Sequence, residues 1–329
     1  MEAWLINLGG FVAVVLTEQE LSGYFESLSN WQRWGPDDTL GTLNHITPEK
    51  RKAAATSIVL GRAVSCARAI TTGPQVNDVE GVAPQRYMLA SGEGLASGTD
   101  GSTGPRGVGF AEYLGFVFHG VRITHLDALG HESWDGQLYN GVPAAAVTTQ
   151  AGATRHDVVS ARQGVFTRAV LVDIARFRGV PWLQPGEAVT RREVEDFLAA
   201  TGTVIGPGDG LLLRTGYPAL VAERGPVDQH SADRAGWHAS CLPLFHENDI
   251  AFIASDTAQD ARPSEYEMVR NPIHLVGLVA MGLWLVDNCD FEDLSAHCDE
   301  LGTQAFAMTF APIPFSGATG SPVNPLALF

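Results

Sequence analysis

The spacing of apolar residues changes along this chain between the period of a helix and the short apolar runs of strands. This pattern predicts helices and strands in succession. Helical spacing or a helix-start signal predicts helices over residues 18–28, 47–61, from 190 onward, 235–247, 272–281 and 292–301. Short runs rich in β-branched, aromatic or aliphatic side chains predict strands over residues 63–69, 116–124, 165–174, 211–214, 249–255, 283–286 and 305–311. Neither a linker nor a repeat separates these elements, so the pattern favours one α/β domain.

The first thirty residues stand apart from this alternation. Residues 3–16 form an apolar run that is too short to span a bilayer, and no basic segment precedes it. We therefore expect residues 1–30 to be an N-terminal extension with one helix and residues 31–329 to be the main domain. The cytoplasm is the expected location.

The stretch from Thr124 to His131, Thr-His-Leu-Asp-Ala-Leu-Gly-His, carries the densest candidate chemistry. If the strand over 116–124 continues through Asp127, His125 and Asp127 point to the same face, with Cα atoms roughly 6–7 Å apart. His131 follows a short break and can fold back over that face. Imidazole and carboxylate together suit zinc, manganese or iron in a site with open positions. An ordinary hydrogen bond within a strand is the alternative interpretation.

Charge and cysteine content narrow the choice of partner and compartment. Lys and Arg number 21 against 37 Asp and Glu, so the formal net charge is −16, which argues against nucleic acid and anionic membranes as partners. The 4 cysteines include no Cys-x-x-Cys pair and are expected to be buried free thiols in a reducing compartment. Neither Gly-x-Gly-x-x-Gly nor Gly-x-Ser-x-Gly occurs, which weakens a dinucleotide-binding or serine-hydrolase interpretation.

Residues 90–107 form the loosest segment of the chain, because glycine and serine recur through it. No Gly-Lys-Ser/Thr follows, so this is not a phosphate-binding loop. Its position directly before the His-Asp stretch suggests a lid over the site, and a plain surface loop is the alternative.

The stretch around His125 resembles the motif His-x-Gly-Thr-His-x-Asp-x-Pro-x-His of the metal-dependent cyclase family, which includes bacterial kynurenine formamidase and isatin hydrolase. Thr124, His125, Asp127 and His131 match this motif, whereas Val121, Ile123 and Leu129 replace its first His, its Gly and its Pro. The similarity extends from about residue 34 to residue 311 and includes Ser255-Asp-Thr257, Asn271-Pro-Ile-His274 and Val286-Asp287-Asn288. The segments 34–44 and 124–129 are most similar to a longer branch that includes a zinc-dependent trans-dienelactone hydrolase.

This resemblance implies a single α/β domain of the swivelling β/β/α type, usually a homodimer. It also implies one or two divalent metals, with Zn²⁺ expected ahead of Mn²⁺, bound by His125, Asp127, His274 and Asp287. The shorter Asp287 stands where many relatives have Glu. His131 falls at the position of the general acid/base.

The family's first ligand is replaced by Val121, which cannot bind metal, so a mononuclear site is favoured. His119 is an even number of residues from His125, so it would point to the same face of a strand and could replace the lost ligand. A straight strand would place it roughly 20 Å from His125, so only a bulge or a sharp bend would bring it into the site.

Six further residues are candidates for contact with the substrate or with the metal ligands. Trp34, Asn44, Trp134 and Tyr139 are candidates for binding substrate, although the aromatic residues among them are equally well explained as core. Asp256 and Gln259 follow a predicted strand end and are expected to support the metal ligands.

The candidate residues and the resemblance together predict hydrolysis of an amide, cyclic imide or lactone bond in a small, partly apolar ring substrate. Metal-activated water would attack the carbonyl and His131 would carry the proton. The alternatives are a ring-forming or dehydrating enzyme on the same scaffold, and a non-catalytic metal- or ligand-binding protein.

Overall fold

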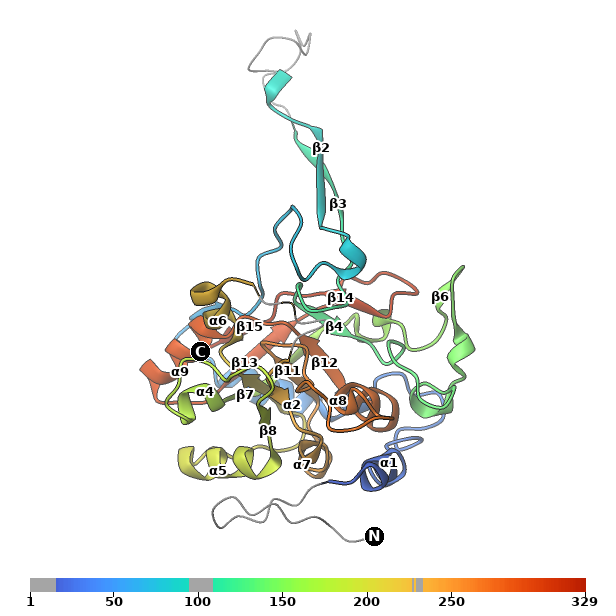
Figure 1. Ribbon diagram of the computed structural model, residues 1–329, viewed down its shortest axis with the longest axis vertical. Coiled ribbons are helices and arrows are strands. Elements are labelled where there is room, and N and C mark those ends of the chain that lie inside the picture. Colours follow the sequence, from blue (N-terminus) through green and yellow to red (C-terminus); the bar gives the residue numbers. More distant parts are fainter. Residues whose placement is uncertain (1–15, 95–108, 227, 229–232) are drawn as a thin grey trace.

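Four parallel strands form the centre of the main sheet in the computed structural model, which describes residues 16–94, 109–226, 228 and 233–329 (Figure 1). They are β7 (Val165–Asp173), β9 (Gly210–Arg214), β11 (Phe252–Ser255) and β12 (Trp284–Asp287). Antiparallel strands flank them, namely β13 (Ala305–Phe310), β15 (Leu326–Leu328) and β1 (Ala63–Ser65) beyond β7, and β4 (His125–Asp127) and β14 (Gly320–Pro322) beyond β12. The strand order is β1-β15-β13-β7-β9-β11-β12-β4-β14.

Helices connect these strands and cover the sheet (Figure 1). They are α1 (Glu18–Ser27), α2 (Pro48–Thr56), α4 (Ile174–Phe177), α5 (Arg191–Thr201), α6 (Tyr217–Arg224), α7 (Leu242–Glu247), α8 (Pro272–His274) and α9 (Glu292–Leu301). The helix α8 continues directly into a π-helical segment, Leu275–Met281. Three small two-stranded sheets add β2 (Gln85–Ala90) with β3 (Ala111–Gly115), β5 (Val147–Thr148) with β6 (Gly152–Ala153), and β8 (Ala188–Val189) with β10 (Gly236–Trp237).

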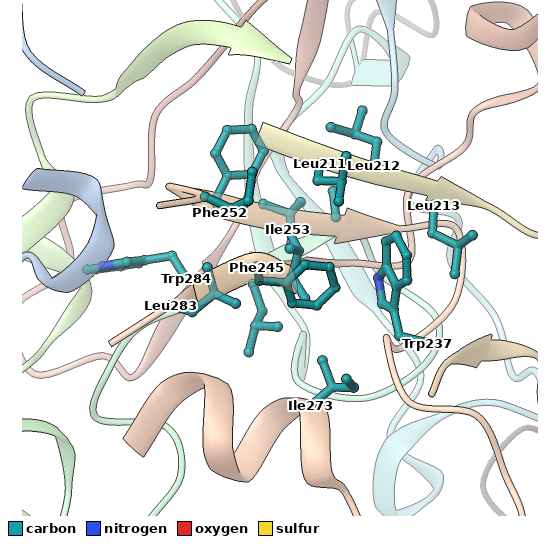
Figure 2. Close-up of a cluster of buried hydrophobic side chains, with 14 of the residues drawn as sticks. Leu211, Leu212, Leu213, Trp237, Phe245, Phe252, Ile253, Ile273, Leu283 and Trp284 are labelled. Atoms are coloured by element: carbon teal, nitrogen blue, oxygen red, sulfur yellow. The ribbon is translucent and has the colours of Figure 1, made fainter. Parts of the chain in front are cut away.

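The core lies against the central parallel strands (Figure 2). Leu211, Leu212 and Leu213 of β9 are fully buried, as are Phe252 and Ile253 of β11. Strands that are buried on both faces read as continuous apolar runs rather than as alternating ones. β11 ends directly before Asp256 and β12 ends at Asp287, so this packing positions two of the candidate residues.

Many predicted elements are confirmed. α1 and α9 occupy the predicted ranges, and β7, β9, β12 and β13 match theirs to within a residue or two at either end. The side chains of Thr47 and Thr190 accept hydrogen bonds at the starts of α2 and α5, as their sequences predict. All four cysteines are buried and free. The mixed α/β fold of one domain agrees with the predicted class.

The predicted strand over 116–124 is wrong, because this segment is irregular and only His125–Asp127 is a strand. Three of its backbone carbonyls, those of Gly120, Val121 and Ile123, accept from side chains instead of from a neighbouring strand. Asn288 donates to the carbonyls of Gly120 and Ile123, at 2.8 and 3.2 Å. Gly120 also has a φ of 141°, which turns the chain sharply.

Four other predictions were too long, among them the strand predicted over 249–255, which begins only at Phe252. The strand predicted over 63–69 ends at Ser65, and Ala67 forms an isolated bridge with Cys289. The helix predicted over 235–247 begins only at Leu242, because Pro243 in its first turn prevents a helix from continuing upstream. The predicted helix end near residue 61 is likewise late, since α2 ends at Thr56. The strands β14 and β15 were not predicted.

The helix α1 packs on the body of the molecule rather than standing free. Leu21 is completely buried in the core, and the Glu18 carboxylate accepts from the backbone of Glu267, Met268 and Val269. Residues 1–15, and with them almost all of the apolar run 3–16, lie outside the described residues, as do residues 95–108 of the glycine-rich segment. In the part of the chain that the structure describes, no helix has the length and apolarity needed to cross a membrane.

Candidate metal centre

The candidate site lies where β4 pairs with β12. The antiparallel register places His125 opposite Asp287, and Asp127 opposite Leu285. His125 and Asp127 are two residues apart on β4 and share a face, as predicted. Their side chains approach to 3.4 Å between His125 Nε2 and Asp127 Oδ1. The local strand period therefore aligns two candidate ligands, and the sheet register adds a third.

The carboxylate of Asp127 is the centre of this cluster. Its Oδ1 lies 2.9 Å from His119 Nδ1 and 3.9 Å from His131 Nε2. Its Oδ2 lies 3.6 Å from His274 Nε2, and that nitrogen is 3.3 Å from Asp287 Oδ2. Five of the candidate residues thus gather around one acid.

Three histidines are held by the ring nitrogen that faces away from Asp127. His125 Nδ1 lies 2.8 Å from the Ile123 carbonyl, His274 Nδ1 lies 2.5 Å from Asp260 Oδ2, and His119 Nε2 lies 3.0 Å from Thr319 Oγ1. Such outer hydrogen bonds fix the orientation of metal-binding histidines and raise the basicity of the inner nitrogen.

Buried polar atoms without hydrogen-bond partners test whether these residues fit a metal. Both carboxylate oxygens of Asp127 and Nδ1 of His119 are buried without a well-directed hydrogen bond, although buried polar atoms normally have one. Ligand atoms of His119, Asp127 and His131 lie within 4.8 Å of one another, as do those of His125, Asp127 and Asp287. The residues therefore fit a divalent cation, with Asp127 common to both groups.

His119 enters the site, contrary to the straight-strand geometry. Because residues 116–124 form an irregular turn, its ring returns to β4 and stacks on His131 with centroids 3.9 Å apart. The tilted ring of Phe118 lies 4.6 Å from His119, so an aromatic side chain borders the cluster. His119 thus brings an imidazole to Asp127 although Val121 replaces the first His of the family motif.

Asp287 reaches the cluster despite its short side chain. Gln259 donates from Nε2 to Asp287 Oδ1 at 2.8 Å and to the Val286 carbonyl at 2.9 Å, so it orients this acid. Asp256 has a different role, because it accepts from Thr215 N, Thr215 Oγ1 and Gly216 N. Gln259 therefore supports a candidate ligand directly, whereas Asp256 ties the end of β11 to the end of β9.

The charges in the cluster favour a bound cation. Against the effect of burial, His131 and His125 hold the pKa of Asp127 well below its usual range. Burial, which outweighs the attraction of Asp127, lowers the pKa of His131 to about 4. At neutral pH the cluster thus combines an ionised carboxylate with a neutral imidazole. Against the effect of burial, the neighbouring carboxylates raise the pKa of His125 and His274, so these two candidate ligands would release protons when a cation binds.

Among the described residues, the exposed part of the cluster is the side of His119, His131 and Glu132. His125, Asp127 and Asp287 are at most 2% exposed, whereas the side chains of His131 and Glu132 are 23% and 30% exposed. A substrate would therefore approach over His131 and Glu132.

The four predicted substrate-binding residues contact the N-terminal segments. Trp34 packs edge-on against His45, and Trp134 stacks on Phe25 of α1 with centroids 4.5 Å apart. Asn44 and Tyr139 both donate to the carboxylate of Asp38, at 2.8 and 3.1 Å. These contacts connect residues 25–45 to the loop after the site, and none of them involves the cluster around Asp127.

Sequence reasoning missed three residues beside the cluster, namely Phe118, Glu132 and Asp260. Asp260 follows β11 four residues after Asp256, so its position near a strand end was a usable signal. Glu132 is adjacent to His131 in the sequence. Phe118 was hidden by the incorrect strand assignment.

Comparisons with known proteins identify the family and the fold of this chain. The Cyclase family model matches residues 105–260. A crystal structure described as a novel cyclase is 32% identical and superposes with a TM-score of 0.83, covering 92% of this chain and 100% of its own. No curated protein matches the sequence.

Two more distant structures share the fold. Isatin hydrolase A from Labrenzia aggregata is 15% identical with a TM-score of 0.58, covering 84% of this chain and 95% of its own. Isatin hydrolase A from Ralstonia solanacearum is 16% identical with a TM-score of 0.58, covering 86% of this chain and 97% of its own. From the fold, the site and the identity to the cyclase structure, the chain belongs to the cyclase family.

Proposed function

We propose that this protein is a metal-dependent hydrolase that opens an amide, cyclic imide or lactone bond in a small, partly apolar ring substrate. The observation that carries the proposal is the convergence of three outwardly tethered histidines on Asp127. Its carboxylate oxygens are buried and lack well-directed hydrogen bonds. A structural hydrogen-bond network would satisfy these oxygens, whereas a cation-binding site leaves them available.

His119, His125, Asp127, His274 and Asp287 would hold the divalent ion. Their mixture of imidazole and carboxylate suits Zn²⁺ first and Mn²⁺ second. When bound, such an ion supplies Lewis-acid chemistry that activates water and polarises a carbonyl. The protein's own contribution is to fix the ligands, through Ile123, Asp260, Thr319 and Gln259, before substrate arrives.

His131 is the proposed proton carrier. Its Nε2 lies 3.9 Å from the carboxylates of both Asp127 and Glu132, too far for a direct hydrogen bond. The nitrogen is therefore free to accept a proton at the open side of the cluster. It can later return that proton to the leaving nitrogen or oxygen.

The surroundings favour a compact substrate with an apolar part. Phe118 lines the cluster near His119 and His125 and offers an aromatic surface to a flat ring. Glu132 adds a carboxylate beside His131, which favours a substrate with a hydrogen-bond donor over one with a negative charge. The overall charge of −16 likewise disfavours anionic substrates.

A substrate panel with product mass analysis tests the proposal. Aryl formamides, cyclic imides and unsaturated lactones are incubated with the Zn²⁺- or Mn²⁺-loaded protein, and a chelator-treated sample is the control. We expect at least one class to gain one water in a chelator-sensitive reaction. Ring closure of a linear precursor with loss of water would replace the hydrolase by a cyclase, and bound metal without turnover of any compound would favour the non-catalytic alternative.

A further inference from the structure

Arg234 is a cation in the protein interior whose charge is not balanced by an acid in contact with it. The residue is only 6% exposed, and its Nε donates to the carbonyl of Asp260 at 3.0 Å. Among the described residues, no carboxylate lies within 4.0 Å of this guanidinium, and neither of its terminal nitrogens donates a hydrogen bond. Buried charges are normally paired and hydrogen-bonded, because an isolated charge is costly to remove from water.

The acids near Arg234 face other donors. The carboxylates of Asp260 and Asp287 both face His274, at 2.5 and 3.3 Å from its ring nitrogens. Burial lowers the pKa of Arg234 and the nearby Arg262 lowers it further, against the attraction of Asp260 and Asp287. The guanidinium therefore lacks a counter-charge that the described side chains do not supply.

A small cavity lies against this guanidinium. Its volume is about 10 Å³, which leaves room for one particle of about the size of a water molecule. The hydroxyl groups of Thr215 and Thr257 line it, but they already donate to Asp256 and to the carbonyl of Ala235. Besides Arg234 and these two threonines, the cavity is lined by Pro185, Tyr217, Leu220, Asp233 and Ala235. Asp233 is an exposed residue and forms no ion pair with Arg234 among the described contacts.

We propose that Arg234 binds a chloride ion in this cavity. A water molecule would fill the space but leave the guanidinium charge uncompensated. A monovalent anion supplies the opposite charge at contact distance, where attraction in a protein interior is strongest. The cavity is too small for a carboxylate or a phosphate. Its apolar walls favour chloride or bromide over fluoride, because the larger halides lose their hydration shell at a lower cost.

The proposed chloride site lies at the carboxyl ends of two central strands. Thr215 follows the end of β9, and Thr257 follows the end of β11. Ligands of α/β sheets commonly bind at this edge. The site is separate from the candidate metal ligands, because Arg234 contacts only the carbonyl of Asp260, whereas the Asp260 carboxylate faces His274. An anion here would offset the repulsion between Arg234 and a cation in the cluster.

Thermal melts of the full chain in sodium chloride and in sodium gluconate, at equal ionic strength, test the site in solution. An ion that binds only the folded chain stabilises it. The melting temperature should therefore be higher in chloride, and it should rise by about 2–4 °C for each tenfold increase in chloride above its Kd. Bromide should act as chloride does, and fluoride should have a smaller effect. Equal melting temperatures in chloride and gluconate would overturn the proposal.

Variants of Arg234 locate the effect. Arg234→Met removes the charge but keeps a long side chain, and it should abolish the difference between chloride and gluconate. Arg234→Lys keeps a positive charge and should retain part of the difference, which separates loss of the ion from loss of folding. Arg192→Met on the exposed face of α5 removes one guanidinium as a matched control and should keep the full difference. A full chloride effect in Arg234→Met would place the ion elsewhere.

Crystals of the wild-type protein grown in sodium bromide show the ion directly. We expect one anomalous bromine peak in contact with the terminal nitrogens of Arg234. A water molecule in the cavity, with no anomalous signal, would overturn the proposal. A bromine peak without chloride-specific stabilisation in solution would identify an adventitious ion only and would overturn it as well. Neither measurement uses turnover, so the result is independent of the hydrolase proposal.

Discussion

At the scale of single residues, the two ring nitrogens of a site histidine have different partners. The outer nitrogens of His119, His125 and His274 are held by an oxygen atom, and the inner nitrogens face Asp127. His131 is the exception, because its nearest carboxylates are 3.9 Å from Nε2. The untethered ring is therefore suited to exchange protons, and the tethered rings are suited to hold a cation.

His131→Ala tests whether His131 exchanges protons while the other three histidines hold the cation. We expect the variant to retain most of its metal and to lose about 10²–10⁴-fold in turnover, the usual contribution of general acid/base catalysis. Metal content by mass spectrometry and initial rates on the best substrate of the panel provide the two measurements. Nearly intact turnover would remove His131 as the proton carrier, and loss of metal would make it a ligand.

Asp260→Asn tests the tether on His274. The amide can still accept from the backbone of Ile273, which lies 2.8 Å from Asp260 Oδ1, so the fold should be retained. The charge that orients His274 Nδ1 is lost, and metal affinity should fall by about 10–100-fold. Competition with a chromophoric chelator measures this affinity. Asp299→Asn on the surface of α9 is the control, and an equal affinity in both variants would contradict the role of Asp260.

At the scale of elements, β14 closes the sheet beside the cluster. Gly320 pairs with Asp127 across β4, and its backbone passes close to the ring of His119. A Cβ atom at this position would lie 2.5 Å from the Leu126 carbonyl and 2.7 Å from His119 Cε1. The edge strand therefore determines how near His119 can come to Asp127.

Gly320→Ala should weaken metal binding without altering any ligand. The added methyl must displace either the backbone of β4 or the His119 ring, and overpacking of this kind typically costs about 1–3 kcal/mol. Isothermal titration with Zn²⁺ and a thermal melt measure the two effects. Gly23→Ala, whose new Cβ would meet nothing within 4 Å, is the matched control. Unchanged metal affinity in Gly320→Ala would show that β14 does not position His119.

At the scale of the whole molecule, the cluster connects segments that are distant in the sequence. β4 supplies His125 and Asp127, α8 supplies His274, and β12 supplies Asp287. A cation bound to all three elements binds the folded chain only, since the unfolded chain does not bring them together. Metal binding should therefore contribute to global stability.

Chelation should accordingly lower the melting temperature. A ligand at about 100 times its Kd stabilises the folded state by about 2.7 kcal/mol, so we expect removal of the metal to lower Tm by several degrees. Calorimetry with and without chelator measures this shift. His125→Ala and Asp127→Ala should abolish it together with the bound metal. The same shift in wild type and in both variants would mean that the chelator acts elsewhere.

Local sequence determined those features that depend on a few neighbouring residues. The two-residue period of a strand aligned His125 with Asp127, and short capping signals placed the starts of α2 and α5. Runs of β-branched and aliphatic side chains identified β7 and β9, and β9 is buried on both faces and so has no polar alternation. The positions of His274 and Asp287 came from a family motif rather than from these periods.

Only the tertiary structure decided what completes the cluster. His119 reaches Asp127 because Asn288, far along the chain, binds the carbonyls that a strand over 116–124 would have used. Asp260 meets His274 because its carboxylate also accepts from the backbone of Ile273 at the start of α8. Trp134 stacks on Phe25 of α1 and not on a residue of the cluster. Local periodicity specifies which face of an element a residue occupies. Which elements meet depends on register and long-range contacts, and these form only when the whole chain folds.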